Sequence, residues 1–535
     1  MDNLVKNPTT DASLLEASLW EAFDAGDIAL ALRHAKQLSG DYPQYASGWY
    51  SVSQLAYQLK NFKLATQAIE NALKLVPHSS VYQLQLANLQ GASGAIASLR
   101  NTLEHLDLTT LVTRYQLETA ARLMVVIDDH RRALMLYEQV IDRGEADAQS
   151  YFNVATVCRF LGLLDRASEM LSRCLREDPK HTAARLLDAG LRKKTTDDNQ
   201  VAALTALTGD YEVTPRARVE AGFALAKELE DLGDYKASFS YLSLAATLRR
   251  QHINYNLSND LATIAELAST PVQVPKAMQE ERWNGEGAIF VLGLPRSGTT
   301  LVDRILSMHS DVESIGEPNA LPMSLNRLLV EQHAGRKIDR CRAVQLASEL
   351  PGNAVASRYL SMIQPLLKGQ KCFIDKLPLN YLNVGLIASA MPSAKIVLLE
   401  RAPLDVIYAI YKTLFEDVYP FSYDLVELTR YYIAYRALVA HWLKEMPERI
   451  HRVSYESLVS NPTATIEPLT AFCGLEFEAA MVHPEHNEAA STTASATQVR
   501  QPIHRGSIER WRCYEKELEP VIQMLRNEGI DPYHY

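Results

Sequence analysis

The first half of the chain repeats with a period of 34 residues, and few folds accommodate such a period. Four alanines share one register, and three of them are followed 12 residues later by a proline: Ala31, Ala65, Ala133 and Ala167, with Pro43, Pro77 and Pro179. Small residues let two antiparallel helices approach closely, and proline ends the second helix because it cannot continue it. The pattern predicts an all-α solenoid of helical hairpins over residues 1–250.

Two units of this solenoid, residues 46–77 and 148–179, resemble the tetratricopeptide repeat. Trp49 and Tyr151 stand near the start of the two units, three periods apart, and Leu99 lies in a degenerate unit between them. The resemblance implies a concave groove that binds a protein or peptide partner. The alternative is a stack that only supports the second half. No residue of this region points to catalysis.

Composition excludes several classes of function. The 535 residues allow about two to four domains. A net charge of −10 disfavours nucleic-acid binding. No apolar run approaches the roughly 20 residues of a membrane helix, and the N-terminus lacks the order of a signal peptide. Six cysteines without a CxxC pair predict reduced thiols in a cytoplasmic protein, without a disulfide framework or zinc site.

A second domain, predicted over residues 287–535, follows a linker at 251–286 that is rich in proline and polar residues. It opens with the apolar run Ala288–Leu292, which reads as a buried parallel strand. A turn with the spacing Gly293-x4-Gly298 and a helical run at Leu301–Met308 come next. Strand, glycine-rich turn and helix in this order predict an α/β phosphate-loop domain with a parallel sheet.

The residues of the turn suit a phosphate. Gly298 lets the backbone approach an anion. The amides that follow it point positive charge at that anion, and Ser297, directly before Gly298, is part of the same loop. Thr299 and Thr300 add hydroxyl donors, and Arg296 adds a cation. Thr299 stands where a nucleotide phosphate loop usually has lysine. The loop therefore favours one phosphate carrying another anionic group over a triphosphate; an ordinary strand-to-helix turn is the plain alternative.

The string from Pro295 to Thr300, after an apolar strand, resembles the sulfotransferases. The resemblance extends over roughly 287–535 and is closest to the bacterial repeat-containing group and the tyrosylprotein sulfotransferases. It implies that the loop holds the 5′-phosphosulfate end of 3′-phosphoadenosine-5′-phosphosulfate (PAPS), with no metal.

Two further motifs resemble the catalytic residues of that family. Glu317, in Ile-Gly-Glu-Pro, matches the glutamate that acts as base on the acceptor hydroxyl. Lys376, in Asp-Lys-Leu-Pro, matches the lysine that contacts the transferring sulfuryl group. An exposed loop glutamate and a surface lysine are the alternatives, and His309 is a rival base.

Arg401, after the apolar strand 395–399, resembles the arginine that binds the 3′-phosphate of PAPS. A guanidinium can grip a phosphate through two parallel hydrogen bonds. Eight residues later the family usually has a serine, whereas this chain has Ala409. Tyr408, Lys412 or Thr413 are candidates to replace that donor.

The C-terminal segments supply four more candidates. Tyr455 resembles the tyrosine beside the nucleotide, and Ser495 resembles the serine that touches the reacting centre. Arg505 and Arg510 are candidates for the basic residue that approaches phosphate before the family's tryptophan.

Other groupings favour plain interpretations. In 483–486 two histidines flank Pro484, which breaks the helix that would align them as metal ligands, so an exposed loop is expected. Aromatic residues in 408–435 are expected in the core, with an acceptor pocket as the alternative.

The reading as a whole is sulfuryl transfer from PAPS to a hydroxyl acceptor. Arg296, Glu317, Lys376 and Ser495 serve catalysis in this reading. A protein or peptide acceptor, tyrosine included, stands against a small metabolite, lipid or sugar. A phosphate-loop kinase and a non-catalytic scaffold with a degenerate nucleotide site are the rival functions.

Overall fold

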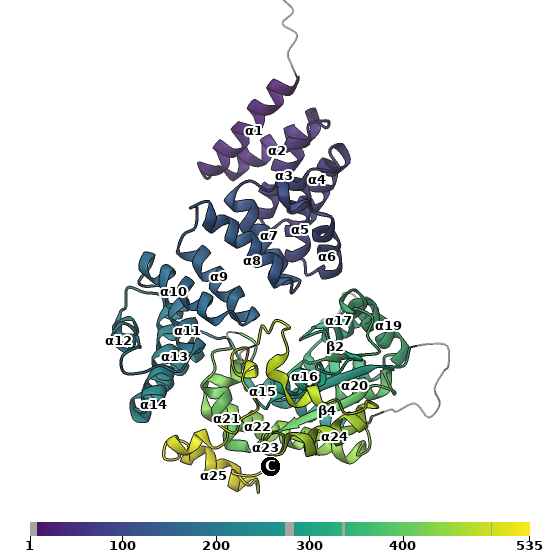
Figure 1. Ribbon diagram of the computed structural model, residues 1–535. Helices are drawn as coiled ribbons and strands as arrows, with labels where there is room; N and C mark the ends of the chain where they lie inside the picture. Colours follow the sequence, from purple (N-terminus) through teal and green to yellow (C-terminus); the bar gives the residue numbers. More distant parts are fainter. Residues whose placement is uncertain (1–7, 273–282, 334–337, 416, 494) are drawn as a thin grey trace, which may run out of the picture. The chain divides into compact units, whose positions relative to one another are not determined.

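The computed structural model describes residues 8–272, 283–333, 338–415, 417–493 and 495–535 (Figure 1). The chain forms two compact units, Met1–Leu161 and Gly162–Tyr535. No helix within the described ranges is both long enough and apolar enough to cross a membrane.

The first unit is a series of antiparallel helices (Figure 1): α1 (Pro8–Asp24), α2 (Ile28–Asp41), α3 (Ala46–Gln58), α4 (Phe62–Leu75), α5 (Ser80–Ala92), α6 (Ile96–His105), α7 (Arg114–Val126), α8 (His130–Asp142) and α9 (Ala148–Leu161). The register alanines Ala31, Ala65 and Ala133 are completely buried, as expected of small residues at helix crossings. The all-α repeat architecture predicted from the period is confirmed.

A second feature of the same register fixes where helices begin. The side chains of Asp27, Asn61 and Asp129, spaced by multiples of 34 residues, each accept a hydrogen bond from a backbone amide of the first turn. Such an N-cap satisfies an amide that has no partner within the helix. Ala95 occupies the same position in the degenerate unit and makes no side-chain cap.

The second unit begins with six more helices: α10 (Leu164–Glu177), α11 (Thr182–Leu191), α12 (Val201–Gly209), α13 (Pro215–Leu232), α14 (Tyr235–Gln251) and α15 (Leu257–Ser269). Phe223 and Leu242, from α13 and α14, share one apolar core with residues of the sheet domain. The predicted linker 251–286 contains α15, and residues 273–282 lie outside the described ranges. The boundaries 1–250, 251–286 and 287–535 stay predictions.

A five-stranded parallel sheet follows, in the order β2-β3-β1-β4-β5. Its strands are β1 (Ala288–Gly293), β2 (Val312–Ser314), β3 (Cys372–Asp375), β4 (Lys395–Glu400) and β5 (Ile450–Ser454). Strand β1 is buried along its whole length and lies between β3 and β4. The α/β phosphate-loop class with a parallel sheet is thereby confirmed.

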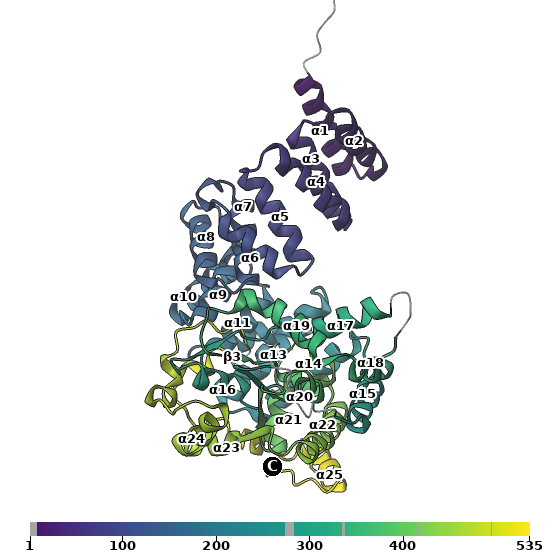
Figure 2. The same ribbon diagram turned by 90° about the vertical axis from the view of Figure 1, so that its right-hand side faces the viewer.

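Helices cover both faces of the sheet. Successive residues of β1 point to opposite sides, so alternate residues pack against different helices. Ile289 and Val291 pack on α16 (Thr299–Leu306), α23 (Tyr455–Ser460) and α24 (Pro462–Cys473). Phe290 and Leu292 face the larger core with α19 (Gly352–Ile363), α20 (Val384–Ala390), α21 (Pro403–Tyr411) and α22 (Leu425–Glu445). Figure 2 shows these two helix groups apart from each other.

The remaining helices are α17 (Ala320–Gln332), α18 (Arg340–Ser348) and α25 (Glu519–Asn527). Tyr408, Tyr431, Tyr432 and Tyr435 of the aromatic run are buried in the larger core, as the plain interpretation expected. Because all strands are parallel, the segments that follow β1, β3 and β4 meet at one edge of the sheet. The candidate site lies there.

Candidate functional site

The phosphate loop connects β1 to α16 through a tight backbone. Gly293 and Gly298 have positive φ angles of 145° and 112°, and a Cβ on Gly293 would lie 2.8 Å from the Leu399 carbonyl oxygen of β4. Arg296 also has a positive φ, 66°, which a residue with a side chain rarely adopts. Thr299 and Thr300 are buried at the start of α16. The strained Arg296 is consistent with a binding role.

The Arg296 guanidinium has neutral partners. Its Nη1 donates to Ser495 Oγ at 2.6 Å, and its Nη2 donates to Gln498 Oε1 at 2.9 Å. Within the described residues, its buried Nε and the buried Oγ of Ser297 have no hydrogen-bond partner. The structure therefore brings together Arg296 and Ser495, which are 199 residues apart. Gln498 was missed in the sequence because no motif residue marks it.

Arg401 lies against the same loop. Its Nη1 donates to the Arg296 carbonyl oxygen at 2.8 Å, and its Nη2 donates to the Ser507 carbonyl oxygen at 2.6 Å. Its guanidinium carbon is 4.5 Å from the centre of the Tyr455 ring. That ring also packs on Gly298, where a Cβ would lie 2.7 Å from Tyr455 Cδ2. Tyr455 thus joins loop and arginine into one surface.

The two arginines share one charge environment. Burial, together with the nearby positive charge of Arg401, lowers the pKa of Arg296 to about 10. The carboxylate oxygen that approaches Arg401 is Asp405 Oδ1, at 3.7 Å. Arg401 Nε, like Arg296 Nε, is buried and has no partner in the described part of the chain. Two adjacent cations with unused donors fit an anion such as a phosphate.

Lys376 and Glu317 come together from different loops of the same edge. The Lys376 ammonium donates to Glu317 Oε1 as an ion pair. Lys376 is buried, whereas 41% of the Glu317 side chain is exposed. The Lys376 amide also donates to the Gly316 carbonyl oxygen at 2.9 Å, which ties the two loops together. A buried cation beside an accessible carboxylate suits proton transfer next to developing charge.

Two buried carboxyl groups, both missed in the sequence, surround this pair. Burial raises the pKa of Asp375 to about 7, although the Tyr359 hydroxyl and Lys376 oppose the rise. Burial also raises the pKa of Asp303 in α16, with Lys376 opposing and Glu317 adding to the rise. Asp303 lies in α16, close enough to Lys376 and Glu317 for their charges to change its pKa. Asp375 directly precedes Lys376 within the Asp-Lys-Leu-Pro motif, and that position is the sequence signal that could have identified it.

The other candidates lie in varied surroundings. Arg505 is exposed and donates to the Ser460 carbonyl oxygen at 3.3 Å. Arg510 lies 3.5 Å from Glu230 of α13. His309, the rival base, accepts from the Asp311 amide and lies 3.6 Å from Glu478. Lys412 donates to Glu230 at 2.9 Å.

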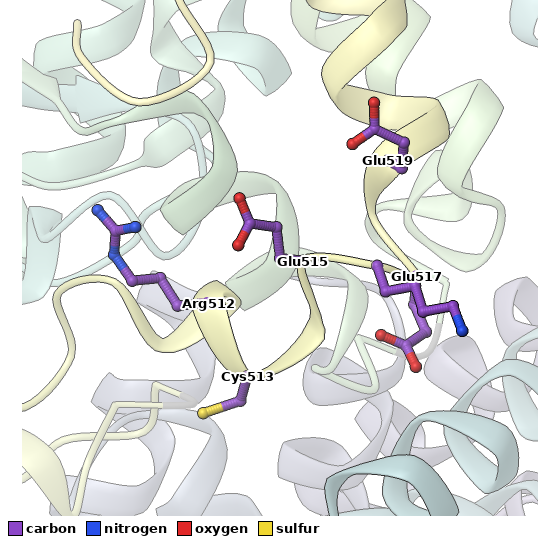
Figure 3. A pocket seen from close by; sticks show the side chains of 6 residues that line it. Arg512, Cys513, Glu515, Glu517 and Glu519 are labelled. Carbon is purple, nitrogen blue, oxygen red and sulfur yellow. The ribbon is translucent and has the colours of Figure 1, made fainter.

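A surface pocket elsewhere is lined by the side chains of one C-terminal stretch: Arg512, Cys513, Glu515, Lys516, Glu517 and Glu519 (Figure 3). Three of these side chains are carboxylates, which repel a phosphate, and no candidate site residue is among them. The His483–His486 segment forms short turns, with His483 contacting Glu485 at 3.2 Å. Among the described residues, no group of three or more histidine, cysteine, aspartate or glutamate side chains is arranged to hold a metal.

Comparison with known proteins identifies both regions. A model of the sulfotransferase family matches residues 288–479, and a model of the tetratricopeptide repeat matches residues 148–181. An uncharacterized protein of Aquifex aeolicus is 32% identical over 378 residues. That match covers 69% of this chain and 49% of the Aquifex protein, so the chain spans about half of its relative's length.

Other relatives are named as protein-tyrosine sulfotransferases. Protein-tyrosine sulfotransferase 1 of Danio rerio is 24% identical over 261 residues, covering 46% of this chain and 72% of that protein. Among solved structures, the sulfotransferase domain of the Synechococcus PCC 7002 olefin synthase is 20% identical, covers 49% of this chain and 99% of its own, and has a TM-score of 0.33. The chain thus contains a region that matches the sulfotransferase family and, before it, a region that matches the tetratricopeptide repeat.

Proposed function

We propose that this chain, with its sulfotransferase-family domain, transfers a sulfuryl group from PAPS to a hydroxyl group of a protein or peptide. The observation that carries the proposal is the pair Arg296 and Arg401 at the phosphate loop. Their hydrogen-bond partners are neutral oxygens, Asp405 Oδ1 lies 3.7 Å from Arg401, and the buried Nε of each arginine has no partner within the described residues. Such a pair fits the bisphosphate of PAPS better than it fits an uncharged ligand.

The loop and the two arginines hold the nucleotide in this proposal. Residues 297–300 bind the 5′-phosphate through loop amides and hydroxyl groups, and Arg401 binds the 3′-phosphate. The Tyr455 ring packs against both Arg401 and Gly298 of the loop and so supports them. Arg296, fixed by Ser495 and Gln498, faces the reacting end. Arg505 and Arg510 add positive charge from the C-terminal segment.

The Lys376–Glu317 pair performs the proton chemistry. PAPS, when bound, supplies the activated sulfuryl group. Glu317 takes the proton of the acceptor hydroxyl as the new oxygen–sulfur bond forms. Lys376 stabilises the negative charge on the bridging phosphate oxygen as the old sulfur–oxygen bond breaks, so that adenosine 3′,5′-bisphosphate leaves. Positioning and electrostatics account for this chemistry, and it needs no bridging metal.

A protein or peptide acceptor is the version that we favour. It is supported by the names of the relatives, which are protein-tyrosine sulfotransferases, and by the repeats, since such solenoids form extended binding surfaces. The cytoplasmic location expected from the cysteine usage stays a prediction that cell fractionation tests.

Calorimetric titration of the purified chain tests the nucleotide assignment. We expect adenosine 3′,5′-bisphosphate to bind more tightly than ATP or adenosine 5′-monophosphate, because Arg401 reads the 3′-phosphate. Equal or tighter ATP binding contradicts the proposal and favours a kinase. No binding of any of the three favours the scaffold.

Incubation of a cell lysate with the chain and ³⁵S-labelled PAPS tests the acceptor. Label in protein, lost on protease treatment, supports the proposal. Label confined to small molecules or lipid retains the enzyme and overturns the acceptor class.

A further inference from the structure

One carboxylate of the helical segment enters the sulfotransferase-family domain. Glu230, near the end of α13, accepts hydrogen bonds from the Tyr408 hydroxyl at 2.5 Å and the Tyr514 hydroxyl at 3.0 Å, both through Oε2. Its Oε1 accepts from Lys412 Nζ at 2.9 Å and lies 3.5 Å from Arg510 Nη2. Only 10% of the Glu230 side chain is exposed. A carboxylate with three hydrogen-bond donors and an adjacent guanidinium is well satisfied and firmly placed.

The two cations that Glu230 holds belong to the phosphate-loop side of the domain. Lys412 directly follows α21, the helix that begins two residues after Arg401. Arg510 follows Ser507, whose carbonyl oxygen accepts from Arg401. Arg401 in turn donates to the Arg296 carbonyl oxygen. Contacts and short stretches of chain thus connect α13 to the loop.

Electrostatics agree with this proximity. Burial lowers the pKa of Lys412, and Arg510 and Arg296 lower it further, while Glu230 raises it. Burial acts to raise the pKa of Glu230, but Lys412, the Tyr408 hydroxyl and Arg510 outweigh it and lower that pKa below its usual value. Glu230 therefore both contacts Lys412 and favours its charged form.

We propose that Glu230 is a positioning residue of the nucleotide site, which holds Lys412 toward the phosphates bound by Arg296 and Arg401. This inference rests on the proposed function. It makes helix α13, which lies outside the matched residues 288–479, part of the apparatus that sets nucleotide affinity. Lys412, three residues beyond Ala409, then supplies a phosphate donor where the chain lacks a hydroxyl.

The test is a double-mutant cycle on the full chain, read out as the dissociation constant of adenosine 3′,5′-bisphosphate. Glu230→Gln keeps an acceptor for the tyrosine hydroxyls and removes the charge. We expect it to weaken binding about tenfold, the size of a charge-assisted hydrogen bond. Lys412→Met is expected to weaken binding at least as much. Because Glu230 acts through Lys412, the double variant should bind no more weakly than Lys412→Met.

Controls separate positioning from a loss of fold. Lys412→Arg, with Glu230 intact, should retain most of the affinity. Lys444→Met, an exposed lysine of α22, should leave affinity unchanged. Adenosine 5′-monophosphate should lose little affinity in Glu230→Gln if the missing contact is to the 3′-phosphate. If Glu230→Gln lowers the unfolding midpoint, the affinity of the double variant, which lacks both charges, is compared with that of Lys412→Met instead.

Three results overturn the inference while wild-type binding stands. They are unchanged affinity in Glu230→Gln, a further loss when Glu230→Gln is added to Lys412→Met, and tighter binding in Glu230→Gln. The last would mean that Glu230 competes with phosphate for the cations. Failure of the wild-type chain to bind the bisphosphate instead overturns the proposed function, and this inference with it.

Discussion

The two sides of the candidate site lie at one edge of the sheet but differ in charge. On the β1–β4 side, Arg296 and Arg401 meet carbonyl and hydroxyl oxygens, and their Nε atoms are unused. On the β3 side, Lys376 pairs with Glu317 and lies next to buried Asp375. Cations whose hydrogen-bond partners are neutral suit anion binding, whereas a cation hydrogen-bonded to an exposed carboxylate suits proton transfer. The contrast separates binding from chemistry.

The largest effect is expected on the β3 side, from Glu317→Gln. The amide cannot take a proton, so turnover with a peptide acceptor should fall about 100- to 10,000-fold, the range of general-base catalysis. Affinity for adenosine 3′,5′-bisphosphate should stay within about twofold. Initial rates and calorimetry measure the two quantities. Retained turnover removes Glu317 from its role, and a large loss of affinity erases the contrast between the sides.

The buried Asp375 should make stability depend on pH. Its pKa is about 7 in the folded chain, against about 3.9 when unfolded. The folded state therefore holds a proton that the unfolded state has lost, and wild-type stability falls as the pH rises from about 4 to 7. Asp375→Asn cannot titrate.

We expect the free energy of unfolding of Asp375→Asn, relative to wild type, to rise by about 2–4 kcal/mol between pH 4 and 7 and then to level off. Urea unfolding at a series of pH values measures it. Exposed Asp197→Asn provides the matched control and should show no such trend. A relative stability that is flat with pH would mean that Asp375 titrates normally.

On the β1–β4 side, Arg401→Met should weaken binding of adenosine 3′,5′-bisphosphate about 10- to 100-fold, since bidentate charged hydrogen bonds are lost. Adenosine 5′-monophosphate should be affected much less. Arg526→Met, on α25, is the matched control. Equal losses for both nucleotides would show that Arg401 does not distinguish the 3′-phosphate.

The smallest effect is expected from Ser495→Ala. Arg296 loses one neutral acceptor but keeps its hydrogen bond to Gln498 and its own backbone conformation. Affinity should therefore fall about two- to fivefold. Calorimetry measures this loss, and turnover distinguishes the two roles of Ser495. A fall in turnover far beyond the fall in affinity would place Ser495 at the reacting centre and bring the two sides of the site together.

Local pattern was sufficient to predict much of the architecture. The 34-residue register located the helical hairpins, because a repeated crossing needs a repeated small residue, and Ala31, Ala65 and Ala133 are buried there. The apolar run before Gly293 and the glycine spacing located β1 and the loop, since both depend on neighbours in the chain. The N-caps at Asp27, Asn61 and Asp129 recur with the same spacing, so the register could also have predicted where these helices begin.

Long-range partners had no such local basis. Glu317 and Lys376 were each identified by a motif, but their ion pair joins residues 59 apart in the chain. Gln498 and Asp375 were missed because nothing in their own segments specifies what lies opposite. The packing of α13 and α14 into the core of the sheet domain is also long-range, and no local pattern in these helices specifies it.

The amino-acid order alone determined which segments become hairpins, which strand leads into a phosphate loop, and which side chains carry charge beside it, because these follow from periodicity and neighbouring backbone. Only the tertiary structure decided that Arg296 and Arg401 share an edge with neutral hydrogen-bond partners, and that Glu230 reaches Lys412, 182 residues further along the chain. Parallel strand pairing and core packing choose these neighbours, and charge acts through space rather than along the chain.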